Sequence, residues 1–190
     1  MRKVAVVLLL GLIGVFGVAA MAFADHGNDG KRSFFTEMDG WAETPMSIVT
    51  PADGSFRLRI VNPELWEFVL RWEDLEGGPA TAAHIHVGSH HEGGGVSAHL
   101  CGGTQPPCEP GTPPDADPRG GEVRGFIDPT DVTGPTAQGV EPGRMDKLLR
   151  AIRVGEGYAN VHNARYGGGE IRGQLADRHN HGGRGGDNDD

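Results

Sequence analysis

Hydrophobic and polar residues alternate along two neighbouring segments in the first half of the chain. In residues 55–60, apolar side chains occupy every second position and arginines lie between them. The alternation resumes over residues 65–72, where tryptophan, phenylalanine and leucine share one side. Successive side chains of a strand point to opposite faces, so each segment predicts a strand with one buried and one solvated face. Because Asn62-Pro63 interrupts the pattern, we expect the two strands to form a hairpin.

Further strands are predicted downstream. Residues 82–88 form another short strand pattern, and the hexapeptide GGEVRG at 120–125 recurs as GGEIRG at 168–173, an offset of 48 residues. We expect each hexapeptide to open a strand with glycine. Residues 88–121 carry glycine, proline, histidine and both cysteines and are predicted to form one long loop, which in a compact domain is usually functional or disordered.

One helix is predicted between Pro142 and Gly155. Four apolar side chains recur there at helical spacing: Met145, Leu148, Leu149 and Ile152. Proline near the start and glycine just past the end are typical of helix boundaries. Strands with alternating polar and apolar sides, short turns and one isolated helix predict an all-β fold, an antiparallel β-sandwich or barrel with one short helix.

The composition agrees with short elements joined by turns. The 190 residues include 32 glycines and 13 prolines, about twice the usual share, so long helices are not expected. The length suits one domain with tails. A formal net charge of -9 argues against binding to a phosphate backbone, which depends on dense Lys and Arg, and nucleic acid is therefore excluded as a partner.

The N-terminus has the order of an export signal. Arg2 and Lys3 precede an apolar stretch that ends in Ala22-Phe23-Ala24, which predicts a signal peptide over 1–24 and a secreted or periplasmic protein. A cut after Ala22 fits nearly as well. Alternatively the stretch stays as an anchor, since about twenty apolar residues can span a bilayer, and membrane association is expected only in that case.

Two segments outside the domain are predicted to lack fixed structure. Residues 25–32 form a polar, flexible N-terminal segment, and residues 178–190 form a Gly/His/Asp tail without apolar side chains. Such composition cannot bury enough apolar surface to offset the entropy of ordering. The folded domain is accordingly expected over 33–177.

Export favours a disulfide between the two cysteines. Cys101 and Cys108 bracket a short loop, and an even cysteine count in an oxidising compartment favours pairing. The alternative is a pair of metal thiolates, but the spacing is not the C-x-x-C of zinc ribbons.

Five motifs, in order and in spacing, resemble the CHRD domain, which is named for the developmental antagonist chordin and also occurs singly in exported bacterial proteins. They are FFTEMDGWAETP near 34–45, GGPATAAHIHVG at 77–88, GEVRG at 121–125, GYANVH from 157 and GGGEIRGQL ending at 175. The resemblance covers roughly 33–177.

The resemblance implies an extracytoplasmic β-sandwich, with a Greek-key, immunoglobulin-like or superoxide-dismutase-like topology. It implies a noncatalytic binding or cell-envelope role, with an extracytoplasmic protein or envelope component as partner. Growth-factor binding is not carried over, because chordin's cysteine-rich repeats have no counterpart here. The chain departs from the family pattern after AHIH, where it inserts His90-His91-Glu92 and the loop bracketed by cysteines.

Three histidines are candidate metal ligands. His84 and His86 are two residues apart on one predicted strand and therefore share a face, while His162 lies opposite Val161 on another. Three imidazoles suit copper or zinc, and the chain implies no other cofactor. Further histidines at 90, 91 and 99 lie nearby in the sequence.

A structural interpretation of the same face is also open. If the predicted strands are neighbours, the histidines share the face with Glu122 and Arg124 and with Glu170 and Arg172. These charges can satisfy one another across strands in a hydrogen-bonded ladder.

Catalysis is not expected. The chain has no Gly-x-Ser-x-Gly motif, no free reactive cysteine and no recognisable carboxylate pair. A superoxide-dismutase-like activity is the remaining enzymatic alternative, although only three histidines fall on predicted strands.

Overall fold

The computed structural model describes residues 31–108 and 117–177. The predicted signal peptide (1–24), the tail (178–190) and all but the last two residues of segment 25–32 lie outside the described residues. Within the described ranges, no helix is both long enough and apolar enough to cross a membrane.

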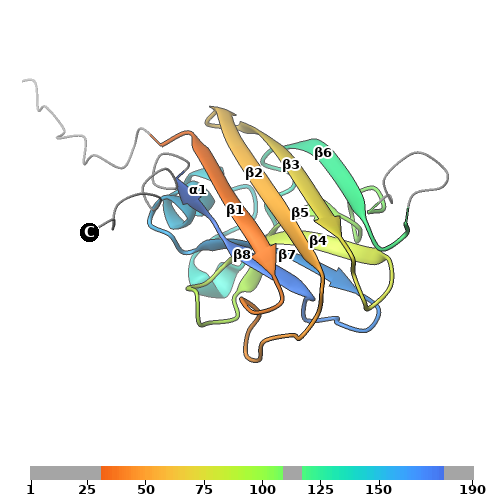
Figure 1. The fold of residues 1–190 in the computed structure, drawn as a ribbon. Helices are drawn as coiled ribbons and strands as arrows, with labels where there is room; N and C mark the ends of the chain where they lie inside the picture. Colours follow the sequence, from red (N-terminus) through yellow and green to blue (C-terminus); the bar gives the residue numbers. More distant parts are fainter. Residues whose placement is uncertain (1–30, 109–116, 178–190) are drawn as a thin grey trace, which may run out of the picture.

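The described chain is mostly antiparallel β-sheet with one short α-helix, which confirms the predicted fold class (Figure 1). The strands are β1 Ser33–Asp39, β2 Asp53–Asn62, β3 Leu65–Glu73, β4 Ala80–Val87, β5 Gly95–Cys101, β6 Gly121–Ile127, β7 Gly157–Asn163, β8 Ile171–Gln174 and β9 Ala176–Asp177. The helix α1 spans Met145–Arg153, and a single 3-10 turn, η1, spans Thr136–Gln138.

The strands form two layers that are joined at one edge. Figure 1 shows β1, β2, β3 and β6 side by side in one layer, with β4, β5, β7 and β8 in the layer behind. The strand order is β5-β4-β7-β8-β1-β2-β3-β6, with β9 paired to β1. Asp39 of β1 pairs with Arg172 of β8, so the two layers are parts of one nearly closed, nine-stranded sheet.

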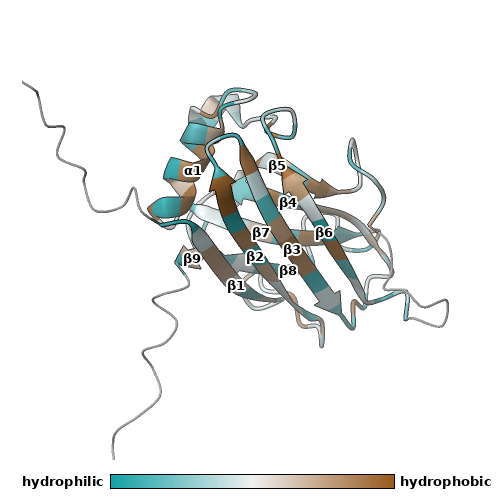
Figure 2. Ribbon diagram, turned by 90° about the horizontal axis from the view of Figure 1, so that it is seen from above, coloured by the Kyte–Doolittle hydropathy of each residue, from teal (hydrophilic) through white to brown (hydrophobic). Residues whose placement is uncertain are grey.

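Apolar side chains fill the space between the layers. Along β2 and β3 hydrophobic and hydrophilic residues alternate, as Figure 2 shows, and the apolar ones face inward. Phe56 and Phe68 pack with ring centroids 6.1 Å apart, and Trp66 is fully buried beside them in the core. Ile85 of β4 is buried in the same core from the opposite layer. Each such side chain stabilises the fold by roughly 1.5–3 kcal/mol through burial.

Most predicted elements are confirmed by the structure. The segments around residues 55–60 and 65–72 form the β2–β3 hairpin, the two hexapeptides lead into β6 and β8, and the apolar spacing from Met145 corresponds to α1. The buried residues of the helix are the four that the spacing selects: Met145, Leu148, Leu149 and Ile152.

The prediction of one long loop over 88–121 was wrong. Residues 95–101 form β5, which pairs with β4 at the edge of the back layer. Gly93 and Gly94 precede the strand, Gly95 is its first residue, and the polar residues Ser97 and His99 alternate with its apolar ones. Ser97 is nevertheless fully buried, so its polarity did not mark a solvated position.

The outer face of β4, β7 and β8 is covered by loops. All seven residues of β7 are buried, on both of its faces. The inner face meets the apolar core, whereas the outer face carries polar side chains that contact the loops after β1, β4 and β7. This second, polar interior contains the candidate site.

Candidate metal centre

Neighbouring strands bring the three predicted histidines to the same face of the sheet. In the β4–β7 pairing, His84 lies opposite Asn160 and Ala82 lies opposite His162, so His162 is a diagonal neighbour of His84. Ile85 and Val161, which alternate with the histidines, are fully buried in the core. The predicted orientation of these strands is confirmed.

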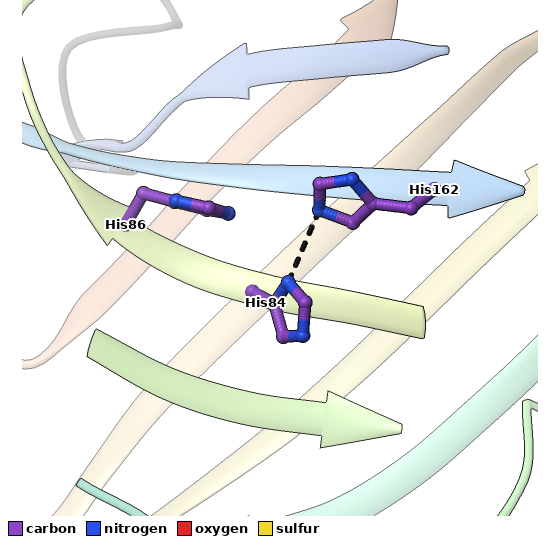
Figure 3. Close-up of side chains that lie close together, drawn as sticks. All are labelled: His84, His86 and His162. Carbon is purple, nitrogen blue, oxygen red and sulfur yellow. Dashed lines mark hydrogen bonds between the residues drawn. The ribbon is translucent and has the colours of Figure 1, made fainter. Parts of the chain in front are cut away.

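The ring nitrogens of His84, His86 and His162 converge. One nitrogen from each ring lies within 4.8 Å of those of the other two. As Figure 3 shows, His84 and His162 approach most directly, with Nδ1 of His84 3.1 Å from Nε2 of His162. Ligands about 2.0–2.1 Å from a tetrahedral zinc ion lie roughly 3.4 Å apart. The ring nitrogens therefore lie within about 1.5 Å of the spacing that one shared ion needs.

Backbone carbonyl groups fix which nitrogen of two rings is free. Nδ1 of His86 lies 3.1 Å from the oxygen of Gly94, and Nδ1 of His162 lies 3.2 Å from the oxygen of Gly167. A carbonyl oxygen only accepts, so both Nδ1 atoms carry the proton and both Nε2 atoms present a lone pair. This is the usual outer-sphere arrangement of metal-binding histidines.

The Nε2 atom of His86 is buried and has no hydrogen-bond partner. Most buried polar atoms in proteins are paired, so an unpaired one calls for an explanation. A metal ion bound among the three rings would supply the missing interaction, and the donor set therefore fits such an ion.

Burial keeps the three imidazoles uncharged. Burial, together with the neighbouring histidines, lowers the pKa of His84 to about 3 and that of His86 to about 4. Burial also lowers the pKa of His162. Only the neutral ring can bind a metal, so these environments hold the ligands in the competent form at neutral pH.

A stack of three side chains supports His86. The ring of Tyr158 lies parallel to that of His86, with centroids 4.8 Å apart, and the guanidinium of Arg172 lies 3.6 Å from the Tyr158 ring. The backbone N–H of Gly94 donates to the Tyr158 hydroxyl at 2.9 Å. Tyr158 thus contacts both the His86 ring and the residue whose carbonyl orients that ring.

Arg172 holds the loop that follows β4. The side chain is 1% exposed and donates to the carbonyl oxygens of Ser89 and Glu92 and to the hydroxyl of Thr44. These bonds satisfy a cation that would otherwise be costly to bury. They also close the loop over the outer face of the sheet.

A buried carboxyl group lies next to this network. Asn160, which pairs with His84 across the strands, donates its side-chain amide to both oxygens of Glu43 at 3.1 and 3.3 Å. Burial raises the pKa of Glu43 to about 7, while nearby Arg172 lowers it in part. The sequence placed Glu43 within the FFTEMDGWAETP motif (34–45) but did not predict its burial, because that depends on Asn160, which is far away in the sequence.

The prediction of a Glu-Arg ladder on this face was wrong. Glu122 and Arg124 lie on β6, at the other end of the strand order, where Glu122 pairs with Arg71 of β3 and with Arg124. Glu170 does not pair with Arg172 either. Its carboxylate accepts from Thr50, Asn163 and the backbone N–H groups of two residues in the β3–β4 loop, Glu76 and Gly77.

His99 is a further histidine of the cluster that was predicted to lie only in a loop. It pairs directly with His84 across β4 and β5, and the two ring centroids lie 4.7 Å apart. His90 and His91 follow β4 in the loop and are not members of the group with converging nitrogens.

The predicted disulfide is present. Cys101 and Cys108 are joined, so they do not act as metal thiolates. The bond closes a loop whose Gly103 approaches His99, since a Cβ atom on this glycine would lie 3.4 Å from His99 Nδ1.

The fold and the site define the class of protein: an all-β domain stabilised by a disulfide, with a buried histidine cluster beneath its loops. The chain belongs to the CHRD domain family, whose model matches residues 34–175. No curated protein and no solved structure matched the chain. Family and disulfide together suggest an extracellular or otherwise oxidising compartment.

Proposed function

We propose that this CHRD domain binds one copper or zinc ion through His84, His86 and His162. The observation that carries the proposal is the unpaired, buried Nε2 of His86, which lies in a group of ring nitrogens within 4.8 Å of one another. Imidazole nitrogen suits both metals. The two Nδ1–H bonds to backbone carbonyls leave the remaining nitrogens free to bind the ion.

The proposed role is binding in a secreted or periplasmic setting, not catalysis. Two of the three rings are buried, and the loop after β4 covers the stack behind His86. We expect copper-loaded protein to dismutate superoxide no faster than free copper does.

Isothermal titration of the chain from Asp25 onward with Zn²⁺ and with Cu²⁺ tests the proposal. The experiment uses a background in which the tail residues His179 and His181 are replaced by alanine, so that the tail adds no sites. We expect one ion per chain, and at least a hundredfold weaker binding after His86→Ala or His162→Ala, because each removes one of three ligands.

His91→Ala is the matched control, because this histidine follows the same strand but lies outside the converging group. We expect it to bind as tightly as the parent chain. Absence of a bound ion in the parent, or unchanged binding in both ligand variants, would contradict the proposal.

A second role, recognition of an envelope component or an extracytoplasmic protein, is favoured by a separate observation. The loop between β1 and β2 exposes three apolar side chains: Trp41 (65%), Met46 (72%) and Val49 (76%). Apolar side chains gathered on one surface loop are typical of interaction sites. The two roles use different residues and are compatible.

A further inference from the structure

His84 differs from the other two proposed ligands in the nitrogen that it presents. His86 and His162 offer Nε2 and donate Nδ1–H to a backbone carbonyl. His84 offers Nδ1, so the nitrogen that needs an outer partner is Nε2. Metal-binding histidines almost always donate this second N–H, and the partner fixes the orientation of the ring.

His99 occupies the position where such a partner is needed. The strand order β5-β4-β7 puts His84 between His99 and His162. In Figure 3 the second nitrogen of His84 points away from His162, toward β5. The rings of His84 and His99 meet edge to face, at 88°.

The Nδ1 atom of His99 is available to accept a hydrogen bond. It is buried and has no partner. Gly103, held at φ +63° in the loop closed by the disulfide, lies beside this atom and covers it. The cysteine-bracketed loop therefore contacts His99 at the edge of the cluster.

We propose that His99 is a positioning residue for the metal site, whose Nδ1 accepts the Nε2–H bond of His84 when the ion is bound. The inference rests on the proposed metal-binding function. Without the ion, Nδ1 of His84 donates to Nε2 of His162, because the Nδ1 proton of His162 is already donated to Gly167.

Binding of the ion then changes the tautomer of His84. In the metal-bound state the Nδ1 proton would be released to water, which leaves the Nδ1 lone pair for the ion, and Nε2 would take up one proton from water. The ring stays neutral and no proton is gained or lost overall. His99 stabilises the new tautomer, because it lies on β5, the strand toward which Nε2 of His84 points (Figure 3).

The test compares His99→Leu, which removes the acceptor at similar volume, with His99→Gln, which keeps an acceptor oxygen. Affinity for Zn²⁺ and Cu²⁺ is measured by chelator competition in the same tail-substituted chain. We expect His99→Leu to weaken binding about 10–100-fold, the range for lost outer partners. We expect His99→Gln to recover most of that loss, with one ion bound in every case.

Pulsed EPR of the copper-loaded chains counts the coordinated imidazoles. We expect three in the parent and three in both variants, since His99 acts through His84. A count one lower in the variants would make His99 a ligand and overturn the proposal, as would a parent-like affinity in His99→Leu. If His99→Leu does not fold, His99→Phe replaces it with the same expectations.

Failure of the underlying function gives a different result. A parent chain without bound metal refutes metal binding itself, and the positioning role falls with it. A parent that binds one ion while all His99 variants bind equally refutes only the role of His99.

Discussion

Glu43 is an acidic side chain in an environment that disfavours its charge. It is 6% exposed, and Asn160 donates to both of its oxygens. Burial raises its pKa from 4.5 to about 7. The folded state therefore holds the proton more tightly than the unfolded state does, and the contribution of Glu43 to stability declines as pH rises from about 4.5 through 7.

Glu43→Gln should remove this pH dependence. The amide keeps an acceptor for Asn160 but carries no charge. Relative to the parent, the variant should gain on the order of 2 kcal/mol in unfolding free energy between pH 5 and pH 8, because one pKa unit corresponds to about 1.4 kcal/mol. Urea unfolding at both pH values measures the difference, in metal-free protein.

Glu64→Gln is the control, since Glu64 is exposed in the turn between β2 and β3. Its effect on stability should be small and the same at both pH values. The unfolding free energies of Glu43→Gln and the parent could instead differ by the same amount at both pH values. That result would show that Glu43 is ionised in the folded state over the whole range.

At the level of elements, Arg172 connects strand β8 to two loops. Its guanidinium donates to Thr44 in the loop after β1 and to Ser89 and Glu92 in the loop after β4. Lysine keeps the charge but cannot reproduce this planar set of donors. We expect Arg172→Lys to cost about 3 kcal/mol of unfolding free energy, since breaking a buried charge network costs roughly 3–5 kcal/mol.

Hydrogen exchange distinguishes a local effect from a general loss of stability. The backbone N–H of Gly94 bonds to Tyr158 in the stack below Arg172, and its protection should fall more than that of the β2–β3 hairpin. Arg59→Lys is the control, because Arg59 pairs with Glu67 at the surface and such pairs contribute about 0.2–1 kcal/mol. If both variants lost the same unfolding free energy, Arg172 would not hold the two loops against β8.

The strands that sequence patterns predicted best are those with one solvated face. In β2 and β3 the polar positions meet water, so alternation of residue type matches alternation of burial. In β7 every residue is buried. Its polar residues face the interior beneath the loops and its apolar residues face the core, so residue type no longer tells which positions meet water. His84, His86 and His162 could be predicted because strand periodicity still decides which side chains share a face.

The remaining features depended on tertiary contacts. The hexapeptides at 120–125 and 168–173 are nearly identical, yet Arg124 is exposed and Arg172 is 1% exposed. Their surroundings differ because β6 is an edge strand and β8 lies beneath loops. No local pattern shows that difference, and the surroundings of Glu43 and His99 were not predicted for the same reason.

At the level of the whole molecule, the loop between β1 and β2 has two sides: Glu43 and Thr44 contact the polar interior, whereas its apolar side chains are exposed. The loop displays Trp41, Met46 and Val49, whereas the histidines lie beneath covering loops. Replacing all three apolar residues by serine should leave the unfolding free energy nearly unchanged, because they are already exposed. Metal affinity should also be unchanged.

The same triple variant should lose association with the cell envelope. The measurement is the fraction of exported protein that stays with washed envelopes, compared between the parent and the serine variant. Equal retention would remove the loop as an interaction site. Retention that depends only on whether residues 1–24 remain attached would assign association to that segment instead.

The order of strands in the sheet also constrains when the site can form during folding. His84 and His86 lie on β4, near the middle of the chain, but their partner His162 lies on β7, and β1 is bonded to β8 and β9 near the far end. A nascent chain that ends before Gly157 lacks both the third imidazole and the strand that joins the two layers. At the proposed site, an ion would therefore be captured only after β7 has joined the sheet, and a bound ion would report that this late step of folding is complete.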